Sequence, residues 1–283
     1  MSIEVKDLKK KYFKKEAVKG ATFTIESESI IGLLGRNGAG KSTVLNMIAR
    51  RIEKTSGEIT LDGVDLHKNP NAMHEVYLSS SDNWFPREYK FKDLLTIYQG
   101  TYPEFDMEFA EDLIKVFDVN VKGKYSKAST GYQSIMKIIL ALCNPSEYIF
   151  LDEPVLGLDA NHRQLFNKKL LEAYARRPRT FVIATHLIEE VASILEKVIV
   201  IKDGVVTEEV LVEDVLHKGY VVSGASTLVE EYVADKKVLE TDRIGNFTRS
   251  VVIGAIGEAQ PGLEFSPLTL QDYFISITRK ENE

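Results

Sequence analysis

The 283-residue sequence has almost no cysteine and no long apolar run. Its one cysteine, Cys143, excludes an intrachain disulfide, and its place after the mostly apolar run 135–142 predicts a buried structural thiol. No segment reaches the ~18 consecutive apolar residues of a membrane-spanning helix. The first residues also lack the apolar core of a signal peptide. The composition therefore predicts a soluble cytosolic protein and leaves docking onto a membrane protein open.

The sequence also lacks an excess of basic residues. Lys and Arg number 36 against 42 Asp and Glu, which gives a formal net charge of −6. Because binding of duplex nucleic acid depends on neutralising phosphates with Lys and Arg, we expect no nucleic acid as the main partner. A local basic patch remains possible. A chain of this length can bury a sizeable core without a disulfide or a metal.

Short β-rich runs alternate with helical patterns over roughly the first 212 residues. Two runs, 30–34 and 148–151, are apolar throughout, as strands covered on both faces of a parallel sheet are. The other expected strands are 21–25, 58–61, 75–78, 180–184 and 197–201, and the expected helices are 41–52, 159–176 and 187–195. This alternation predicts an α/β domain with a mostly parallel sheet. Helical periods dominate from about residue 85 to 145, which indicates a helical insert.

The last ~70 residues have a different pattern. Their β-prone runs are 219–222, 237–244 and 247–253. The second and third are joined by Gly245-Asn246, which is typical of a hairpin. Thr227 and Glu230 have the spacing of a capping box at the start of a short helix, and Ser266-Pro267 is expected to begin a final helix. We expect a small α+β accessory or dimerisation domain over residues 213–283.

The strongest chemical signal follows the strand expected at 30–34. The eight residues Gly35-Arg36-Asn37-Gly38-Ala39-Gly40-Lys41-Ser42 fit G-x-x-x-x-G-K-[ST], and a helix is expected next. The glycines let backbone N–H groups form a nest for phosphate oxygens, and the helix N-terminus adds positive charge. Lys41 is expected to reach the β- and γ-phosphates and Ser42 to ligate Mg²⁺. The full predicted nucleotide site comprises Asn37, Gly38, Ala39, Gly40, Lys41, Ser42 and Thr43.

A second signal is the apolar strand that ends in Asp152-Glu153-Pro154. Carboxylates in that position lie at the C-terminal edge of the sheet, where open α/β sheets bind ligands. Asp152 is expected to hold Mg²⁺, directly or through water. Glu153 is expected to polarise the attacking water as general base.

Together these motifs resemble the ATP-binding subunit of an ABC transporter, over roughly residues 2–212. Ser129-Thr130-Gly131-Tyr132-Gln133 stands where that family has its signature motif, with Thr130 replacing a Gly and Ala128 the usual preceding Leu. The best-matched positions are Ser129 and Gly131.

Three further positions match family motifs. Asp159 resembles the aspartate of the D-loop, and His186, 33 residues past Glu153, resembles the switch histidine that senses the γ-phosphate. Tyr12 resembles the aromatic residue that stacks on adenine, although an ordinary aromatic at a strand end is the other interpretation.

The resemblance implies an ATPase with ATP and Mg²⁺ as its cofactors and the P-loop NTPase fold, including an antiparallel β subdomain. It implies a head-to-tail dimer with a second copy or a paralogous ATPase subunit, in which Ser129 and Gly131 act across the interface. It also implies separate transmembrane subunits and a peripheral location at the cytoplasmic face of the membrane. The expected domains are residues 1–212 and 213–283.

One position departs from the family. Ser80 stands where the coupling loop usually has Gln, sometimes Glu, and serine is too short to bridge Mg²⁺ and the attacking water. A water, Asp82 or Asn83 could substitute.

Aromatic residues are dense in the segment 77–109. Nine occur in these 33 residues: Tyr77, Trp84, Phe85, Tyr89, Phe91, Tyr98, Tyr102, Phe105 and Phe109. They are either the core of the helical insert or part of a groove in which a membrane subunit docks a short helix. The segment 102–106 resembles bacterial exporter ATPases that move peptides, antibiotics or small metabolites. The leading hypothesis is therefore an exporter ATPase, and the alternatives are a soluble ABC-type ATPase, as in cluster assembly, and a non-hydrolysing binding module.

Overall fold

The computed structural model describes residues 1–80, 82, 85–258 and 260–279, without the side chains of Asn71 and Met73. The chain divides into two compact units, Met1–Leu195 with Ile199–Glu209, and Glu196–Val198 with Val210–Glu283. The division falls within a few residues of the boundary expected from the sequence.

The main sheet of the first unit has six strands in the order β10-β9-β3-β8-β7-β6. These are β3 (Ile30–Leu34), β6 (Val76–Ser79), β7 (Tyr148–Asp152), β8 (Thr180–Thr185), β9 (Lys197–Lys202) and β10 (Val205–Leu211). The neighbours β3 and β8, β8 and β7, and β7 and β6 are parallel. Every residue of β3, β7 and β8 is buried, as expected for strands covered on both faces. The predicted α/β fold is confirmed.

A second, antiparallel sheet has the strand order β2-β1-β4-β5. Its strands are β1 (Ser2–Tyr12), β2 (Lys15–Glu26), β4 (Ser56–Leu61) and β5 (Val64–Asp65). Helix α1 (Lys41–Ile48) contacts β2 of this sheet as well as β6, β7 and β8 of the main sheet. Val44, Leu45, Met47 and Ile48 on α1 are buried in one core with residues of both sheets. The burial of this apolar face fixes the helix that follows the Gly35–Ser42 loop.

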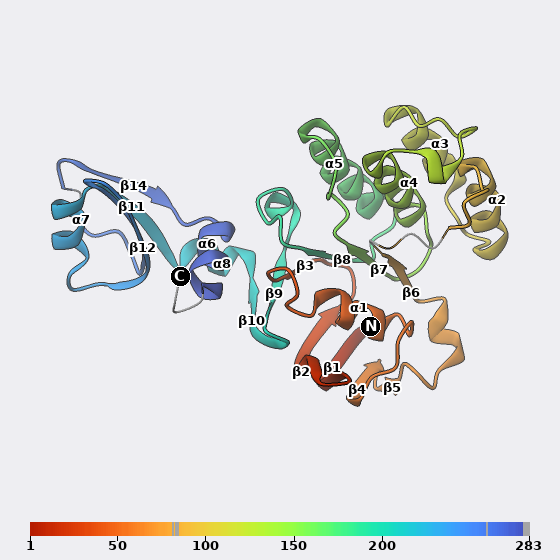
Figure 1. Ribbon diagram of the computed structural model, residues 1–283, viewed down its shortest axis with the longest axis horizontal. Helices are drawn as coiled ribbons and strands as arrows, with labels where there is room; N and C mark the ends of the chain where they lie inside the picture. The colour runs from red at the N-terminus through yellow and green to blue at the C-terminus, as the bar shows by residue number, and fades with distance from the viewer. Residues whose placement is uncertain (81, 83–84, 259, 280–283) are drawn as a thin grey trace. The chain divides into compact units, whose positions relative to one another are not determined.

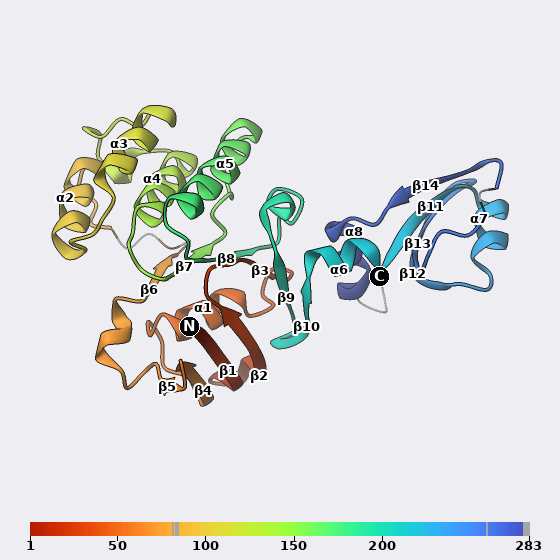
Figure 2. The same cartoon turned by 180° about the vertical axis from the view of Figure 1, so that it is seen from behind.

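The helical insert lies on the opposite side of β3, β8 and β7 from β1, β2 and β4 (Figures 1 and 2). Its helices are α2 (Phe91–Thr101), α3 (Met107–Val116) and α4 (Thr130–Leu142), and α5 (Ala160–Arg176) lies beside them. Cys143 follows α4 and is buried, which raises the pKa of its thiol well above the usual value. The predicted structural thiol is confirmed.

Most of the aromatic residues in the segment 77–109 pack on one another. The ring of Tyr98 contacts those of Tyr77, Phe85, Tyr102 and Phe105 at centroid distances of 5.9–6.5 Å. Phe91, Phe105 and Phe109 are buried, whereas Tyr89 is exposed. Trp84 lies outside the described residues. The aromatic residues that the structure describes therefore supply much of the core of the insert.

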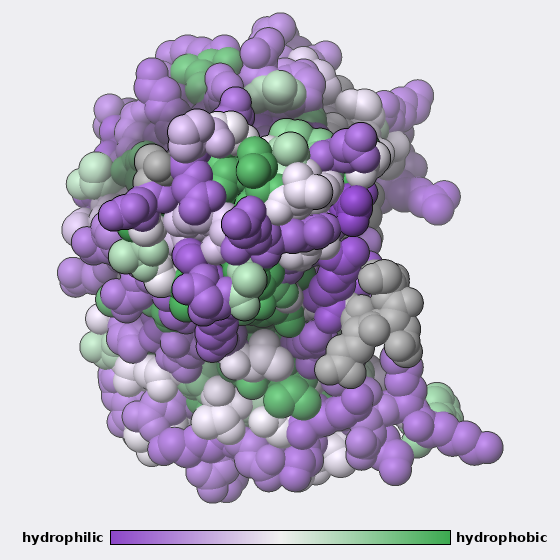
Figure 3. Space-filling view, turned by 90° about the vertical axis from the view of Figure 1, so that its left-hand side faces the viewer, coloured by the Kyte–Doolittle hydropathy of each residue, from purple (hydrophilic) through white to green (hydrophobic). Residues whose placement is uncertain are grey.

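The second unit is a split β-α-β arrangement. Its antiparallel sheet has the order β12-β13-β11-β14, so that β13 lies between the two strands that α7 connects. The elements are α6 (Val212–His217), β11 (Gly219–Ala225), α7 (Ser226–Val233), β12 (Lys237–Ile244), β13 (Phe247–Ile253), β14 (Leu263–Pro267) and α8 (Leu270–Thr278). Tyr220, Val222, Val229, Tyr232 and Val252 form its core. On the face viewed in Figure 3, hydrophobic areas are small and separated by hydrophilic side chains.

Two predicted helix starts in this unit are wrong. Thr227 lies inside α7, which begins one residue earlier, at Ser226. Ser226 is held there because its N–H bonds the Asn246 carbonyl and its hydroxyl accepts from Thr248. Pro267 is the last residue of β14 and pairs with Tyr220, and Thr269 caps α8 instead by accepting the Asp272 N–H. The hairpin at Gly245-Asn246 is confirmed.

Two helices predicted in the first unit differ as well. Residues 187–195 form turns and the 3₁₀ helix Ala192–Ile194 instead of an α-helix, because apolar residues three apart suit a 3₁₀ turn equally well. Helix α1 ends at Ile48, four residues early, since Arg50 adopts a positive φ of 57°. None of the helices in the described part of the chain is long and apolar enough to span a bilayer.

Because each unit has its own core, a chain of residues 1–211 should fold alone. We expect a cooperative thermal transition by circular dichroism and loss of the transition that belongs to the C-terminal unit. Val229→Asp in the full chain should weaken that second transition selectively, because Val229 is fully buried there. A truncated chain without cooperative unfolding would contradict the division into units.

Candidate functional site

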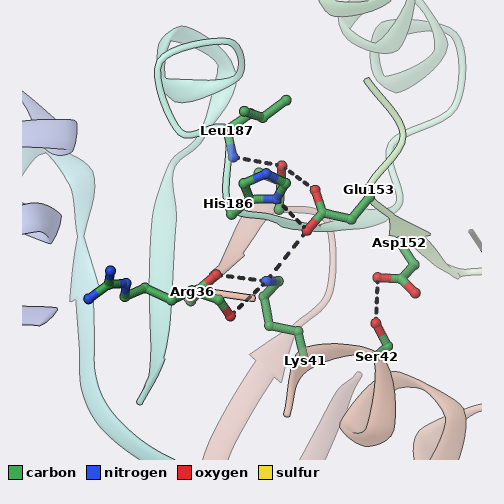
Figure 4. Close-up of polar contacts among 9 residues, drawn as sticks. Arg36, Lys41, Ser42, Asp152, Glu153, His186 and Leu187 are labelled. Carbon is green, nitrogen blue, oxygen red and sulfur yellow. Dashed lines mark hydrogen bonds and ion pairs between the residues drawn. The ribbon is translucent and has the colours of Figure 1, made fainter. Parts of the chain in front are cut away.

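Three chain segments meet at one edge of the main sheet. β8 lies between β3 and β7, and the three strands are parallel, so their carboxyl ends lie side by side. The Gly35–Ser42 loop follows β3, Asp152 and Glu153 end β7, and Thr185 and His186 end β8. Figure 4 shows Lys41 and His186 beside Glu153 and Ser42 beside Asp152, with the Arg36 side chain pointing away from them. The topology thus brings residues 35–42, 152–153 and 185–186 into one site.

The loop after β3 is tightly packed around its glycines. Gly40 has a φ of 113°, and a Cβ there would lie 2.8 Å from the Ala17 carbonyl oxygen. A Cβ on Gly35 would lie 2.6 Å from the carbonyl oxygen of Ile201. Only glycine fits either position without a shift of backbone. Arg36, Asn37, Gly38 and Ser42 are exposed, whereas Ala39 and Lys41 are buried and Thr43 is half-buried.

Lys41 begins α1, and only 5% of its surface is exposed. Its Nζ donates to the carbonyl oxygens of Gly35 at 2.7 Å and Arg36 at 3.4 Å, and lies 3.4 Å from Glu153 Oε1. A buried ammonium is stable only when its donors are satisfied and its charge is paired. The Lys41 ammonium therefore lies against the Gly35–Ser42 loop, and the Glu153 carboxylate compensates its charge.

The Glu153 carboxylate is shared by two neighbours on the β8 end. Its Oε1 lies 3.0 Å from His186 Nδ1, and its Oε2 accepts the Thr185 hydroxyl at 2.8 Å. Thr185 in turn accepts the backbone N–H of Leu187. Glu153 has a φ of 50°, a strained left-handed conformation that is frequent at functional sites. No separate role was predicted for Thr185 from the sequence, where its only signal was its position before His186.

Ser42 and Asp152 form a separate pair. The Ser42 hydroxyl donates to Asp152 Oδ1 at 3.0 Å, and Asp152 is buried. A hydroxyl and a carboxylate oxygen are ligands that Mg²⁺ prefers, with water or phosphate oxygens completing its shell. These two residues therefore fit the predicted metal. In the described residues, no group of three or more His, Cys, Asp or Glu side chains forms a protein-only metal site.

The signature segment begins α4. Ser129 caps this helix by accepting the Tyr132 N–H at 3.3 Å. A Cβ on Gly131 would lie 2.7 Å from the Gly157 carbonyl oxygen, so the helix start packs directly on the loop that leads to Asp159. Among the described residues, neither Ser129 nor Gly131 hydrogen-bonds to Lys41, Glu153 or His186.

Asp159 caps α5. Its carboxylate accepts the backbone N–H of His162 at 2.9 Å and lies 2.8 Å from His162 Nδ1. The hydrogen bond from that backbone N–H holds the pKa of Asp159 below its usual value. The carboxylate therefore stays ionised.

Tyr12 and Ser80 lie at the ends of two other strands, β1 and β6. Tyr12 ends β1 and is 42% exposed, with Lys10 Nζ 4.9 Å from its ring centroid. Ser80 directly follows β6, is 7% exposed, and accepts the Asp82 N–H on its hydroxyl at 3.2 Å.

Comparison with known proteins finds ATP-binding proteins of transporters. A family model described as "ABC transporter" matches residues 18–156. The chain is 30% identical to the ABC transporter ATP-binding protein YtrB of Bacillus subtilis, with 85% of this chain and 78% of that protein covered. It is 26% identical to the Nod factor export ATP-binding protein I of Burkholderia lata, with 99% and 97% covered. An import protein is similar too: the ribose import ATP-binding protein RbsA of Lacticaseibacillus paracasei is 27% identical, with 83% and 49% covered.

Solved structures share the fold. The dimeric structure of MJ0796, described as a bacterial ABC transporter cassette, has a TM-score of 0.65 at 23% identity and covers 74% of this chain and 98% of that chain. The fold of the first unit is therefore that of a known ATP-binding cassette.

The packing of Gly131 on Gly157 gives a stability prediction. Gly131→Ala should destabilise the chain by about 1–3 kcal/mol, because the Cβ would push on a backbone carbonyl. Gly100→Ala on α2 is the matched control, since nothing lies within 4 Å of its Cβ position, and it should be neutral or stabilise by roughly 0.5–1 kcal/mol. Chemical denaturation measures both. Equal effects of the two changes would contradict the close approach.

Proposed function

The chain belongs to the ABC transporter family of ATP-binding proteins and is an ATPase of that family, and from this premise we propose how its residues hydrolyse ATP. The proposal rests above all on one observation, the Glu153 carboxylate held between Thr185, His186 and Lys41 beside the phosphate loop. Glu153 acts as the general base on the attacking water.

The other residues of the cluster position the phosphates. Lys41 exchanges its carbonyl partners for β- and γ-phosphate oxygens, as the loop N–H groups of residues 37–43 bind the same phosphates. His186 contacts the γ-phosphate from the β8 side, and Tyr12 stacks on adenine. Thr185 is a positioning residue that fixes the Glu153 carboxylate through Oε2.

Ser42 and Asp152 hold Mg²⁺ in this proposal. Their oxygen atoms already lie 3.0 Å apart at the start of α1. The bound ion would neutralise negative charge on the β- and γ-phosphates.

The active form is a dimer. In the described part of the chain, neither Ser129 nor Gly131 hydrogen-bonds to the Lys41 cluster. We assign them to the nucleotide of the opposing subunit, where the N-terminus of α4 and the Ser129 hydroxyl face the γ-phosphate. The opposing subunit is a second copy or a paralogous ATPase, and Asp159 lies at the same interface. The dimeric cassette of similar fold supports this arrangement.

We further propose that the dimer drives separate transmembrane subunits from the cytoplasmic face of the membrane and that the transporter is an exporter. The match to a Nod factor export protein extends over nearly the whole of both chains, the C-terminal unit included. The ATPase domain then comprises residues 1–212, with a helical subdomain at about 85–145. Residues 213–283 form an accessory unit that supports dimerisation or regulation.

Glu153→Gln tests the catalytic assignment. Because the amide cannot accept a proton, turnover should fall by roughly 10²- to 10⁴-fold, while ATP binding remains and an ATP-bound dimer accumulates. Phosphate release and sizing with and without Mg-ATP measure both effects. Glu189→Gln is the control, because it makes the same change on an exposed residue near His186. Hydrolysis near the normal rate in Glu153→Gln would show that another group is the base.

Deleting the gene from its bacterial host tests the direction of transport. We expect the minimal inhibitory concentration of at least one antibiotic in a peptide and small-molecule panel to fall, because the drug is no longer expelled. The wild-type gene and the Glu189→Gln gene should restore resistance, and the Glu153→Gln gene should not. Unchanged sensitivity across the panel would contradict export of such compounds and leave the ATPase assignment standing.

A further inference from the structure

Two basic side chains hold the main chain at the end of β6 and in the loop that follows it. Lys137 Nζ donates to the carbonyl oxygens of Ser80 and Asp82, each at 3.0 Å. Arg51 Nη2 donates to the carbonyl oxygen of Leu78 at 2.6 Å. Hydrogen bonds from charged donors are stronger than neutral ones. Three alternate carbonyls, at 78, 80 and 82, are therefore fixed by cations.

The two basic side chains, Arg51 and Lys137, come from different segments of the chain. Arg51 follows α1, the helix that begins at Lys41, whereas Lys137 lies on α4, the helix that Ser129 caps. Lys137 is eight residues after Ser129, which places it about 12 Å along the same rigid helix. The end of β6 is thus bonded to the chain that follows the phosphate-binding helix, and the loop after β6 is bonded to the signature helix.

Lys137 stands in a largely apolar stretch of α4. Its neighbours Met136 and Ile138 are buried, and it lines a pocket of about 130 Å³ with Arg51, Ser80, Asp82 and the rings of Tyr77 and Tyr98. Burial lowers the pKa of Lys137, and the Asp82 and Asp152 carboxylates oppose that shift. An amine there is costly to bury unless its hydrogen bonds are made, so the two carbonyl bonds account for its position.

We propose that Lys137 is a positioning residue that ties the loop after β6 to the signature helix, so that the nucleotide state at Ser129 and the positions of Ser80 and Asp82 change together. The proposal deepens the proposed function and rests on it. The Ser80 side chain is shorter than that of the usual Gln, and its hydroxyl already accepts the Asp82 N–H. The connection therefore runs through main-chain carbonyls and the Lys137 ammonium, whose three N–H donors suit two acceptors at once.

The experiment uses the full chain with Glu153→Gln, which holds the ATP-bound dimer, and compares Lys137→Met with Lys137→Arg. Methionine keeps the length of the side chain without its donors, and arginine keeps the charge and the donors. Lys168→Met, on an exposed position of α5, is the control. Trp84, the sole tryptophan, follows Asp82 by two residues in the sequence and reports on the loop by fluorescence. Hydrogen exchange of peptides covering residues 76–90 gives a second readout.

In the parent chain and in Lys168→Met, Mg-ATP should change Trp84 emission and slow exchange in this segment. Lys137→Met should lose most of both responses and exchange at least roughly tenfold faster without nucleotide, because charged hydrogen bonds are lost. Its affinity for ATP should stay within about threefold of the parent value, and Lys137→Arg should retain the response.

The proposal is overturned if Lys137→Met responds to ATP as the parent does, or if the parent itself shows no response. Both results are separable from failure of the proposed function, since ATP affinity is measured in the same samples. Loss of ATP binding in the parent chain would contradict the proposed function instead.

Discussion

The carboxylate of Glu153 joins the ends of three neighbouring strands. It faces Lys41 after β3 and accepts from Thr185 at the end of β8, while its own backbone ends β7 in a left-handed conformation. Its backbone N–H also bonds the Ala184 carbonyl oxygen at 2.8 Å. With buried strands on either side, this side chain has little freedom to move. A base that must act on one water molecule benefits from being held in this way before the substrate binds.

Backbone contacts set the distances around this carboxylate. Gly40 lies against the Ala17 carbonyl and Gly131 against the Gly157 carbonyl, at separations that a Cβ would close. The first contact holds the phosphate loop to β2, and the second holds the start of α4 to the loop before Asp159. Main-chain atoms cannot move aside by changing rotamer. A displacement of one of the two contacting segments therefore displaces the other. The signature helix and the loop that leads to Asp159 should therefore move as one piece when a second subunit approaches.

The loop after β6 is held differently, by long side chains rather than by close backbone packing. Lys137 on α4 donates to the carbonyl oxygens of Ser80 and Asp82, and Arg51, which follows α1, donates to that of Leu78 in β6. The aromatic residues beside it, Tyr77 and Tyr98 among them, form part of a packed core, so we expect any docking surface there to be formed at the edge of this cluster.

The sequence by itself determined the parts that depend on local pattern. The two fully apolar strands, the Gly35–Ser42 loop, the carboxylates after β7 and the Gly245-Asn246 hairpin follow from spacing and residue type, and the structure has each of them in place. Predictions were wrong where one pattern is compatible with two local structures. The apolar spacing at 187–195 suits a 3₁₀ turn as well as an α-helix. Thr227 and Pro267 were expected at helix starts, but tertiary contacts placed Thr227 inside α7 and Pro267 in β14. Only the tertiary structure decided that Thr185 fixes Glu153 and that Lys137 holds Ser80 and Asp82. Those contacts join residues 32 and more than 50 positions apart, and a lysine in an apolar run has no local partner to indicate where its charge is satisfied.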